Sequence, residues 1–309
     1  MGWRRVARSR SGNELGESSF RVKGIVYMKP LKILSLGAGV QSSTLLLMSI
    51  KGQLPKIDAC VFADTKWEPK EVYEHYDFLR EEAKDSGIPI YSVSGGDLKT
   101  HVIEGQVRGK KSEGQREMPI PLHVLKPDGT KGMVSRQCTS RYKVDPINRF
   151  IKTELLGIKP KGRWPTEVAV DLWFGISADE MRRIRSPDAL WKRHVYPLCN
   201  LPFDYLDVSY NRQRCVAWLA EHYEHHRIPR SACLGCPFKS NTEWRYLRDQ
   251  FPEEWEETIQ VDESLRADGK NNDSYLHASL TPLKDAILGD ENQLSFEGFE
   301  KECLGYCGN

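Results

Sequence analysis

The sequence has no apolar run long enough to span a membrane and too few cysteines for a disulfide scaffold. No stretch approaches the roughly 18–20 apolar residues that a spanning helix needs, and the mean hydropathy is −0.55. The basic N-terminus has no apolar segment of the kind found in secretory signals. Eight cysteines in 309 residues favour a reducing compartment. We therefore expect a cytoplasmic protein that has no membrane partner.

Charge of one sign is also scarce. The chain has 45 Lys or Arg and 43 Asp or Glu, a net charge of +2, which argues against a general polyanion binder. Residues 1–30 are the exception, because they contain seven Lys or Arg and two Glu. We expect these residues to be a flexible basic leader that either touches nucleic acid or simply precedes a folded part beginning at Met28.

Strand and helix patterns alternate from residue 31 onward. Runs rich in Leu and β-branched residues predict strands at 31–36, 57–63, 88–93 and 166–174. Helical spacing predicts helices at 43–50, 70–86 and 144–155, from Ser209 to Tyr223, and within 241–264. Alternation with short connections predicts an α/β fold, a doubly wound and mostly parallel sheet of the Rossmann-like type with a helical C-terminal part.

An insertion at residues 105–135 breaks this alternation. It contains five Gly and three Pro, and a Pro-Asp-Gly-Thr turn at 127–130 between two apolar runs predicts a hairpin. A long irregular insertion in an α/β domain is typical of a lid or substrate loop. Its basic residues are candidates for contact with a nucleic acid: Arg108, Lys110, Lys111 and Arg116.

A glycine turn joins the first predicted strand to the first predicted helix. The residues are Gly-Ala-Gly-Val-Gln-Ser-Ser at 37–43. Small residues let the backbone approach an anion, and the N–H groups at a helix N-terminus together with two hydroxyls can bind it. The turn has neither the Lys of a Walker A loop nor the spacing of a GxGxxG fingerprint. By itself it predicts either an anion site or a plain turn.

This turn resembles the PP-loop of the adenine nucleotide α-hydrolase superfamily. With Phe-Ala-Asp-Thr at 62–65, it is similar to the phosphoadenosine phosphosulfate (PAPS) reductase branch. Three later segments agree in order and spacing: Arg-Gln-Cys-Thr at 136–139 with Lys143, Gly-Ile-Ser-Ala-Asp-Glu at 175–180 with Arg183, and Ser-Ala-Cys-Leu-Gly-Cys-Pro-Phe at 231–238. The ATP pyrophosphatase of DNA phosphorothioation is also similar, and proteins of this kind are often encoded by phages.

The resemblance implies a HUP-type sheet with an adenine nucleotide (PAPS, APS or ATP) across its carboxyl edge. It also implies a PP-loop domain at 31–200, a helical cysteine-containing region at 201–290 and a mobile cysteine tail at 291–309. The residues expected at the nucleotide are Ser35, Gly37, Ala38, Gly39, Gln41, Ser42, Ser43, Asp64, Arg136 and Gly175. Among the basic residues of the matching segments, Arg136 and Arg183 are the expected phosphate ligands, and Arg183 is assigned to catalysis.

Gln41 departs from the family pattern, which has Asp at this position. A carboxylate there could help to hold Mg²⁺, and Gln cannot balance the charge of the ion. Asp179 or Glu180 could supply the missing carboxylate. Alternatively, the two residues are acids that favour a helix N-terminus.

The Cys-x₂-Cys pair Cys233 and Cys236 can chelate one metal centre, which needs two more ligands. The resemblance to phosphorothioation enzymes implies a [4Fe-4S] cluster on these two residues with Cys138 and Cys215, and Cys199 is a rival for the fourth place. A structural Zn²⁺ and a redox or inert dithiol remain alternatives. Three histidines near a helix end favour dipole stabilisation over metal binding: His222, His225 and His226.

Lys-Glu-Cys-Leu-Gly at 301–305 resembles the Glu-Cys-Gly tail of PAPS reductases. The resemblance implies that Cys303 is the catalytic nucleophile that attacks sulfur. Cys307 could resolve Cys303 through a disulfide, and the alternative is a tail with two idle thiols. Cys60 lies in a predicted buried strand and is expected to be core packing.

Two functions of different classes follow. The first is an enzyme, a PAPS reductase-like oxidoreductase or an ATP pyrophosphatase that adenylates a nucleic acid for sulfur insertion. The second is a non-catalytic nucleotide or nucleic-acid binding module. The expected partner is a thiol reductant or a sulfur-donor protein. Nucleic acid is a second candidate, and an oligomer is compatible with the sequence.

Overall fold

The fold is built on a five-stranded sheet whose strands are all parallel. A computed structural model describes residues 4–6, 19–22, 25–104, 118–134, 137–224, 226–266 and 274–289. The strand order is β10-β9-β4-β5-β6. The strands are β4 (Leu31–Leu36), β5 (Ala59–Ala63), β6 (Ile90–Val93), β9 (Val170–Phe174) and β10 (Lys192–Val195). The predicted α/β, Rossmann-like architecture is confirmed.

The order of the strands reverses at β4. The chain runs from β4 outward through β5 to β6, then returns to place β9 on the other side of β4. In open parallel sheets the point of reversal leaves a crevice at the carboxyl ends of the strands, and ligands bind there. Here that crevice lies between the ends of β4 and β9, where the glycine turn follows β4.

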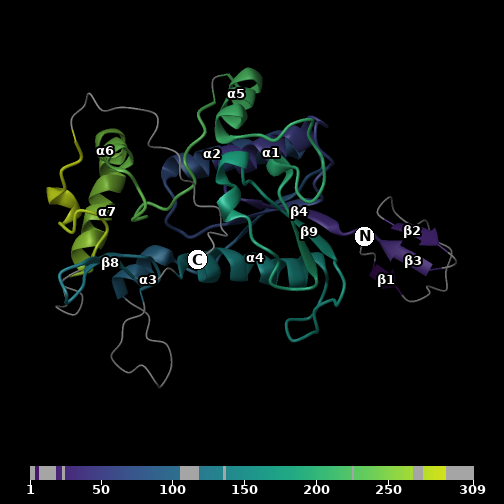
Figure 1. Ribbon diagram of the computed structural model, residues 1–309, viewed down its shortest axis with the longest axis horizontal. Helices are drawn as coiled ribbons and strands as arrows, with labels where there is room; N and C mark the ends of the chain where they lie inside the picture. Colours follow the sequence, from purple (N-terminus) through teal and green to yellow (C-terminus); the bar gives the residue numbers. More distant parts are fainter. Residues whose placement is uncertain are drawn as a thin grey trace.

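Helices cover both faces of the sheet, so that successive strand residues pack into two separate apolar layers (Figure 1). On one face lie α1 (Val40–Ile50), α2 (Lys70–Lys84) and α5 (Arg212–His222). On the other lies α4 (Asp145–Phe150), extended by helical turns at Ser140–Val144 and Ile151–Leu155. The helix predicted at 144–155 therefore begins earlier than expected, at Ser140.

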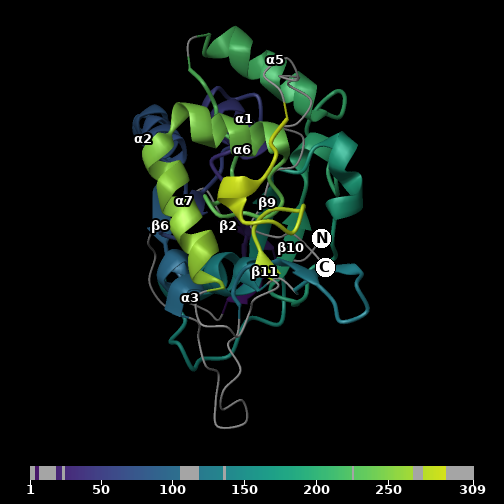
Figure 2. The same cartoon turned by 90° about the vertical axis from the view of Figure 1, so that its left-hand side faces the viewer.

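A third apolar cluster lies beside the sheet. It is formed by residues of α3 (Leu98–Glu104), α6 (Asn241–Gln250) and α7 (Pro252–Ser264). A small sheet of β7 (His123–Leu125), β8 (Lys131–Met133) and β11 (Ser274–Tyr275) borders it through the flanking residues Leu122, Val134 and Leu276. The antiparallel pairing of β7 with β8 confirms the predicted hairpin. Figure 2 shows α7 running from α6 toward α3. Trp67, which follows β5, packs into this cluster and its indole N–H donates to Glu257 at 2.9 Å.

Other local structure differs from the sequence predictions. The helix predicted to start at Ser209 begins at Arg212, because the side chain of Asn211 accepts the Arg214 N–H and caps it. Short 3₁₀ helices connect elements at Ala178–Arg183, Pro197–Cys199 and Leu283–Asp285. Within the expected leader, β1 (Arg4–Val6), β2 (Ser19–Val22) and β3 (Ile25–Met28) form an antiparallel sheet. Across the ranges that the structure describes, no helix combines the length and apolar character of a membrane span.

Candidate nucleotide-binding site

The glycine turn is a closed loop between β4 and α1. The hydroxyl of Ser42 lies 3.2 Å from the N–H of Gly37 and 3.4 Å from the N–H of Gly39. Ala38 has a φ of 53°, a left-handed backbone conformation that residues other than glycine adopt uncommonly. Ser42, predicted to donate to an anion, therefore folds the loop, and the first turn of α1 points its N–H groups toward the carboxyl edge of the sheet.

Gly175 brings the end of β9 against this loop. A Cβ atom at Gly175 would lie 2.6 Å from the Ser42 nitrogen and 2.9 Å from the Gln41 carbonyl carbon. Neither backbone atom can move away as a flexible side chain would, so any residue other than glycine would force the strand and the loop apart. On the far side, a Cβ at Gly37 would lie 3.1 Å from the Ser231 hydroxyl. The loop is thus held between two of the segments on which the predicted resemblance rests, 175–180 and 231–238.

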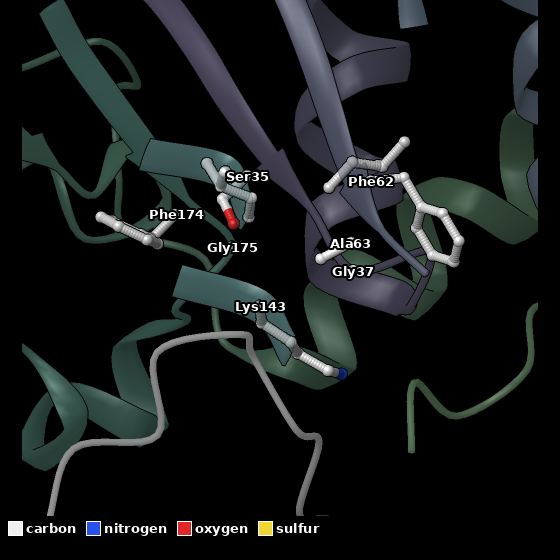
Figure 3. A pocket seen from close by; sticks show the side chains of 9 residues that line it. Ser35, Gly37, Phe62, Ala63, Lys143, Phe174 and Gly175 are labelled. Carbon is white, nitrogen blue, oxygen red and sulfur yellow. The ribbon is translucent and has the colours of Figure 1, made fainter. Parts of the chain in front are cut away.

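A pocket opens where β4, β5 and β9 end, at the point of strand reversal (Figure 3). Its cavity volume is about 10 Å³, the space of roughly one water molecule, so a larger ligand requires the lining side chains to move. Its walls are Ser35, Leu36, Gly37, Phe62, Ala63, Lys143, Ile147, Phe174 and Gly175. The lining is apolar apart from the Ser35 hydroxyl and the Lys143 ammonium group. The chemistry of this lining, though not its volume, suits a flat heterocycle that carries a negative charge at one end.

Two carboxylates stand at the end of β5. Asp64, the predicted nucleoside ligand, accepts from the Lys66 N–H at 2.7 Å and the Tyr73 hydroxyl at 2.9 Å and pairs with the Lys66 ammonium group at 2.6 Å. Asp64 therefore fixes the turn that leads into α2. Glu68 accepts from Thr65 at 3.0 Å and lies 3.7 Å from the Lys143 ammonium. This second contact fixes the amine that lines the pocket. Glu68 was not among the site residues predicted from the sequence.

The structure separates the two acids that could compensate for Gln41. The Gln41 amide donates to the Glu180 carboxylate at 3.0 Å, and Arg183 also pairs with Glu180. Asp179 instead accepts the Arg212 N–H at 3.1 Å, at the start of α5. Burial raises the pKa of Glu180, and Arg183 opposes this shift. Glu180 thus stands beside the loop at the tip of Gln41, whereas Asp179 serves a helix start.

A buried hydrogen-bond chain leads away from the loop. The Ser43 hydroxyl lies 2.8 Å from His75 Nε2, and His75 Nδ1 lies 2.7 Å from His226 Nε2. Burial, with a smaller contribution from His226, lowers the pKa of His75 to about 3. His75 is therefore neutral at physiological pH and has one donor and one acceptor in the chain. His226, interpreted from sequence as a residue near a helix end, is a partner of the loop.

Three of the four cysteines predicted as metal ligands pack near the third cluster. Cys138 and Cys233 lie against it, and Cys236 is buried beside Cys233. The hydrogen bond between Cys233 and Cys236 lowers the pKa of the Cys236 thiol, helped by the charges of Arg230 and Lys239 and opposed by burial. The structure thus forms a polarised thiol pair, with Cys138 close enough to act on the charge of Cys233.

Cys215 is not brought to these three. It is buried on α5 in the apolar layer between α1 and α5. Cys199, the rival, donates to the Ile176 carbonyl at 3.2 Å, and Cys60 is buried in β5 as expected. Over the described ranges no three His, Cys, Asp or Glu side chains are placed to hold a metal ion. Within these ranges the structure therefore shows no four-thiolate [4Fe-4S] or Zn²⁺ site, and that site stays a prediction.

Several predicted residues lie outside the described ranges. They are Arg136, His225, Cys303, Cys307 and the basic residues of the insertion at 108–116. Comparison with known proteins finds no family model that matches the chain and no similar curated protein. A functional assignment must therefore stand on the sequence motifs and on the geometry of the loop and the pocket.

Proposed function

We propose that the protein is a PAPS reductase-like enzyme of the HUP type that binds an adenine nucleotide in the pocket between β4, β5 and β9. The observation that carries the proposal is the contact of Gly175 with the 37–43 loop. It puts the amino end of α1 beside an apolar pocket at the strand reversal. The adenine ring lies at the ends of β4, β5 and β9, beside the Ser35 hydroxyl and the Lys143 ammonium group. The α-phosphate faces the loop, where the N–H groups of α1 and the helix dipole stabilise its charge.

The first candidate reaction reduces a sulfonucleotide. The Cys303 thiolate attacks the sulfur of the sulfate group, and the sulfur–oxygen bond to the nucleotide phosphate breaks. The phosphate oxygen leaves with the electron pair of that bond. A thiol of a reductant protein then attacks the sulfur of Cys303, so that sulfite leaves and a mixed disulfide remains. Lys143 and Arg183 stabilise the charge on the departing phosphate.

A second candidate is favoured by the contact of Gln41 with Glu180. Glu180 supplies a carboxylate beside the loop position at which the family has Asp, and such a group suits Mg²⁺ bound to the phosphates of ATP. In this reaction an oxygen of a nucleic acid attacks the α-phosphate and pyrophosphate leaves. The adenylated oxygen is then displaced by sulfur from a donor protein. The non-catalytic binding module is the alternative from another class.

The test is an anaerobic turnover assay that follows sulfite from PAPS and APS, and pyrophosphate from ATP with Mg²⁺. Sulfite release that Cys303→Ser abolishes supports the reductase. Pyrophosphate release that depends on an added nucleic acid and survives Cys303→Ser supports the ATP-dependent reaction. Ser42→Ala, which opens the loop, should abolish either activity. Nucleotide binding without either product in the wild-type protein would contradict both and leave the binding module.

A further inference from the structure

A broad groove opens near the glycine turn at 37–43, here called the phosphate loop. Val40, the first residue of α1, and Glu180 stand at its loop end. Its walls come from α5, from the segment at 226–230 and from α6. The proposed binding of the α-phosphate leaves the rest of a nucleotide's phosphate chain facing this groove, because Gly37 lines the pocket and Val40, three residues later, lines the groove.

Arg230 in the groove wall has an unused donor. Its side chain is 7% exposed and pairs with Glu243, which is 6% exposed. The Nε atom of Arg230 is buried and has no hydrogen-bond partner among the described residues. Buried N–H groups nearly always have a partner, and leaving one unmade costs stability. An unpartnered guanidinium donor in the wall of a groove therefore indicates a ligand atom that accepts a hydrogen bond.

Lys239 is the second cation of this wall. Its ammonium group lies 5.7 Å from the centre of the Trp244 ring, and within the described part of the chain it makes no ion pair. Glu243, the partner of Arg230, also accepts the Ser240 N–H at 2.6 Å. Burial and then the charge of Arg230 lower the pKa of Lys239, and both cations also act on the Cys236 thiol. An anion bound between Arg230 and Lys239 would relieve their mutual repulsion.

This pair of cations is tied to the phosphate loop. Ser231, the residue after Arg230, packs on Gly37, where its hydroxyl would lie 3.1 Å from a Cβ atom. A short backbone connection therefore joins the Arg230 side chain to the loop itself. Other acids of the groove have partners of their own: Glu71 accepts from the Tyr246 hydroxyl at 2.8 Å, and Glu254 accepts the Lys70 N–H at 2.7 Å.

We propose that Arg230 and Lys239 form a second anion site, which binds the phosphate or sulfate oxygens beyond the α-phosphate of the nucleotide. The proposal rests on the proposed function for the position of the nucleotide. The fork of Arg230 supplies directed hydrogen bonds and Lys239 a point charge. The site would favour nucleotides with a second phosphate or sulfate over AMP, and it would hold pyrophosphate after bond cleavage.

The test is calorimetric titration of the full chain with AMP, ATP and inorganic pyrophosphate at fixed salt. Lys239→Gln removes the charge without breaking an ion pair, and Arg230→Lys keeps the charge and the partner Glu243 but removes the fork. We expect each variant to bind ATP and pyrophosphate about tenfold more weakly, the effect of losing a charge-assisted hydrogen bond, and to bind AMP as the wild type does. Lys84→Gln, at an exposed position on α2, is the matched control and should bind all three ligands normally.

Titration with AMP, ATP and pyrophosphate distinguishes the proposed adenine pocket from the proposed anion site. Wild-type protein that binds neither AMP nor ATP would refute the proposed adenine pocket. Pyrophosphate needs no adenine pocket, so its unchanged affinity in Lys239→Gln and Arg230→Lys would overturn the anion site alone. A single-stranded oligonucleotide is the fourth ligand. If Lys239→Gln weakens its binding and leaves ATP and pyrophosphate unaffected, the cations serve a nucleic acid and the proposal is wrong.

Discussion

The buried histidine of the loop makes stability depend on pH in a calculable way. His75 is 1% exposed, and its pKa is lowered from 6.5 to about 3, first by burial and then by His226. Between these two values the unfolded chain binds a proton that the folded chain does not. Folding therefore has its full His75 contribution above pH 6.5 and loses it as the pH falls toward 3.

The size of the effect follows from the shift. Each pH unit below 6.5 costs about 1.4 kcal/mol of unfolding free energy, so the loss from His75 is about 2 kcal/mol at pH 5. Burial also lowers the pKa of His226, opposed by Glu82, and this adds to the slope in the same direction. Other titrating groups contribute too, so the slope must be assigned by comparing variants.

The assay is urea unfolding at pH values from 7.5 to 4.5, on wild type, His75→Gln and His222→Gln. Gln at position 75 can still bond to the Ser43 hydroxyl but does not titrate, so this variant should lose most of the slope even if its stability at pH 7.5 is lower. His222 bonds to the Trp218 carbonyl at 2.8 Å on α5, and its variant should keep the slope. An unchanged slope in His75→Gln would refute the reasoning.

Three further predictions concern the loop and the cysteines. Gly175→Ala puts a methyl group 2.6 Å from the Ser42 nitrogen; we expect about 1–3 kcal/mol less stability in urea and at least tenfold weaker ATP binding, and normal binding would show that the loop and β9 can separate freely. Gln41→Leu removes a 3.0 Å hydrogen bond to Glu180 and should cost about 1–2 kcal/mol in the same assay, whereas unaltered stability would mean that Arg183 alone satisfies the carboxylate. Because Cys215 packs in the layer between α1 and α5, Cys215→Ala should leave the iron and zinc content of anaerobically purified protein unchanged; loss of metal would restore it as a ligand.

Most strands of the sheet could be predicted because the apolar pattern of their residues follows their burial. Every residue of β5 and of β9 is buried, and fully buried strands appear in sequence as continuous apolar runs. The strand β10 was missed because it begins Lys192-Arg193-His194. Lys192 is neutralised by Asp188, four residues earlier, at 2.6 Å, and Arg193 by Asp171 of the neighbouring strand β9 at 2.7 Å. The second pair joins residues far apart in the chain, and such a pair leaves no local pattern in the sequence.

Some parts of the candidate site could likewise be predicted from the sequence, and others could not. The loop at 37–43 and the segment that begins at Gly175 are each a short continuous motif in the sequence, and the structure brings the two together. The cysteine grouping depended on a choice that the sequence did not decide, although one signal was present: Cys215 shares a buried face of α5 with Trp218 and Leu219, the spacing of core packing. The bond between His75 and His226 spans 151 positions, and only folding brings such residues into contact.

The central claim is that an adenine ring binds between the ends of β5 and β9. Photolabelling with 8-azido-ATP, followed by peptide mass spectrometry, tests it directly. The account predicts that label is incorporated in the peptides that contain Phe62 or Phe174 and that excess ATP prevents it. Labelling confined to other peptides, or labelling that ATP does not reduce, would contradict the account.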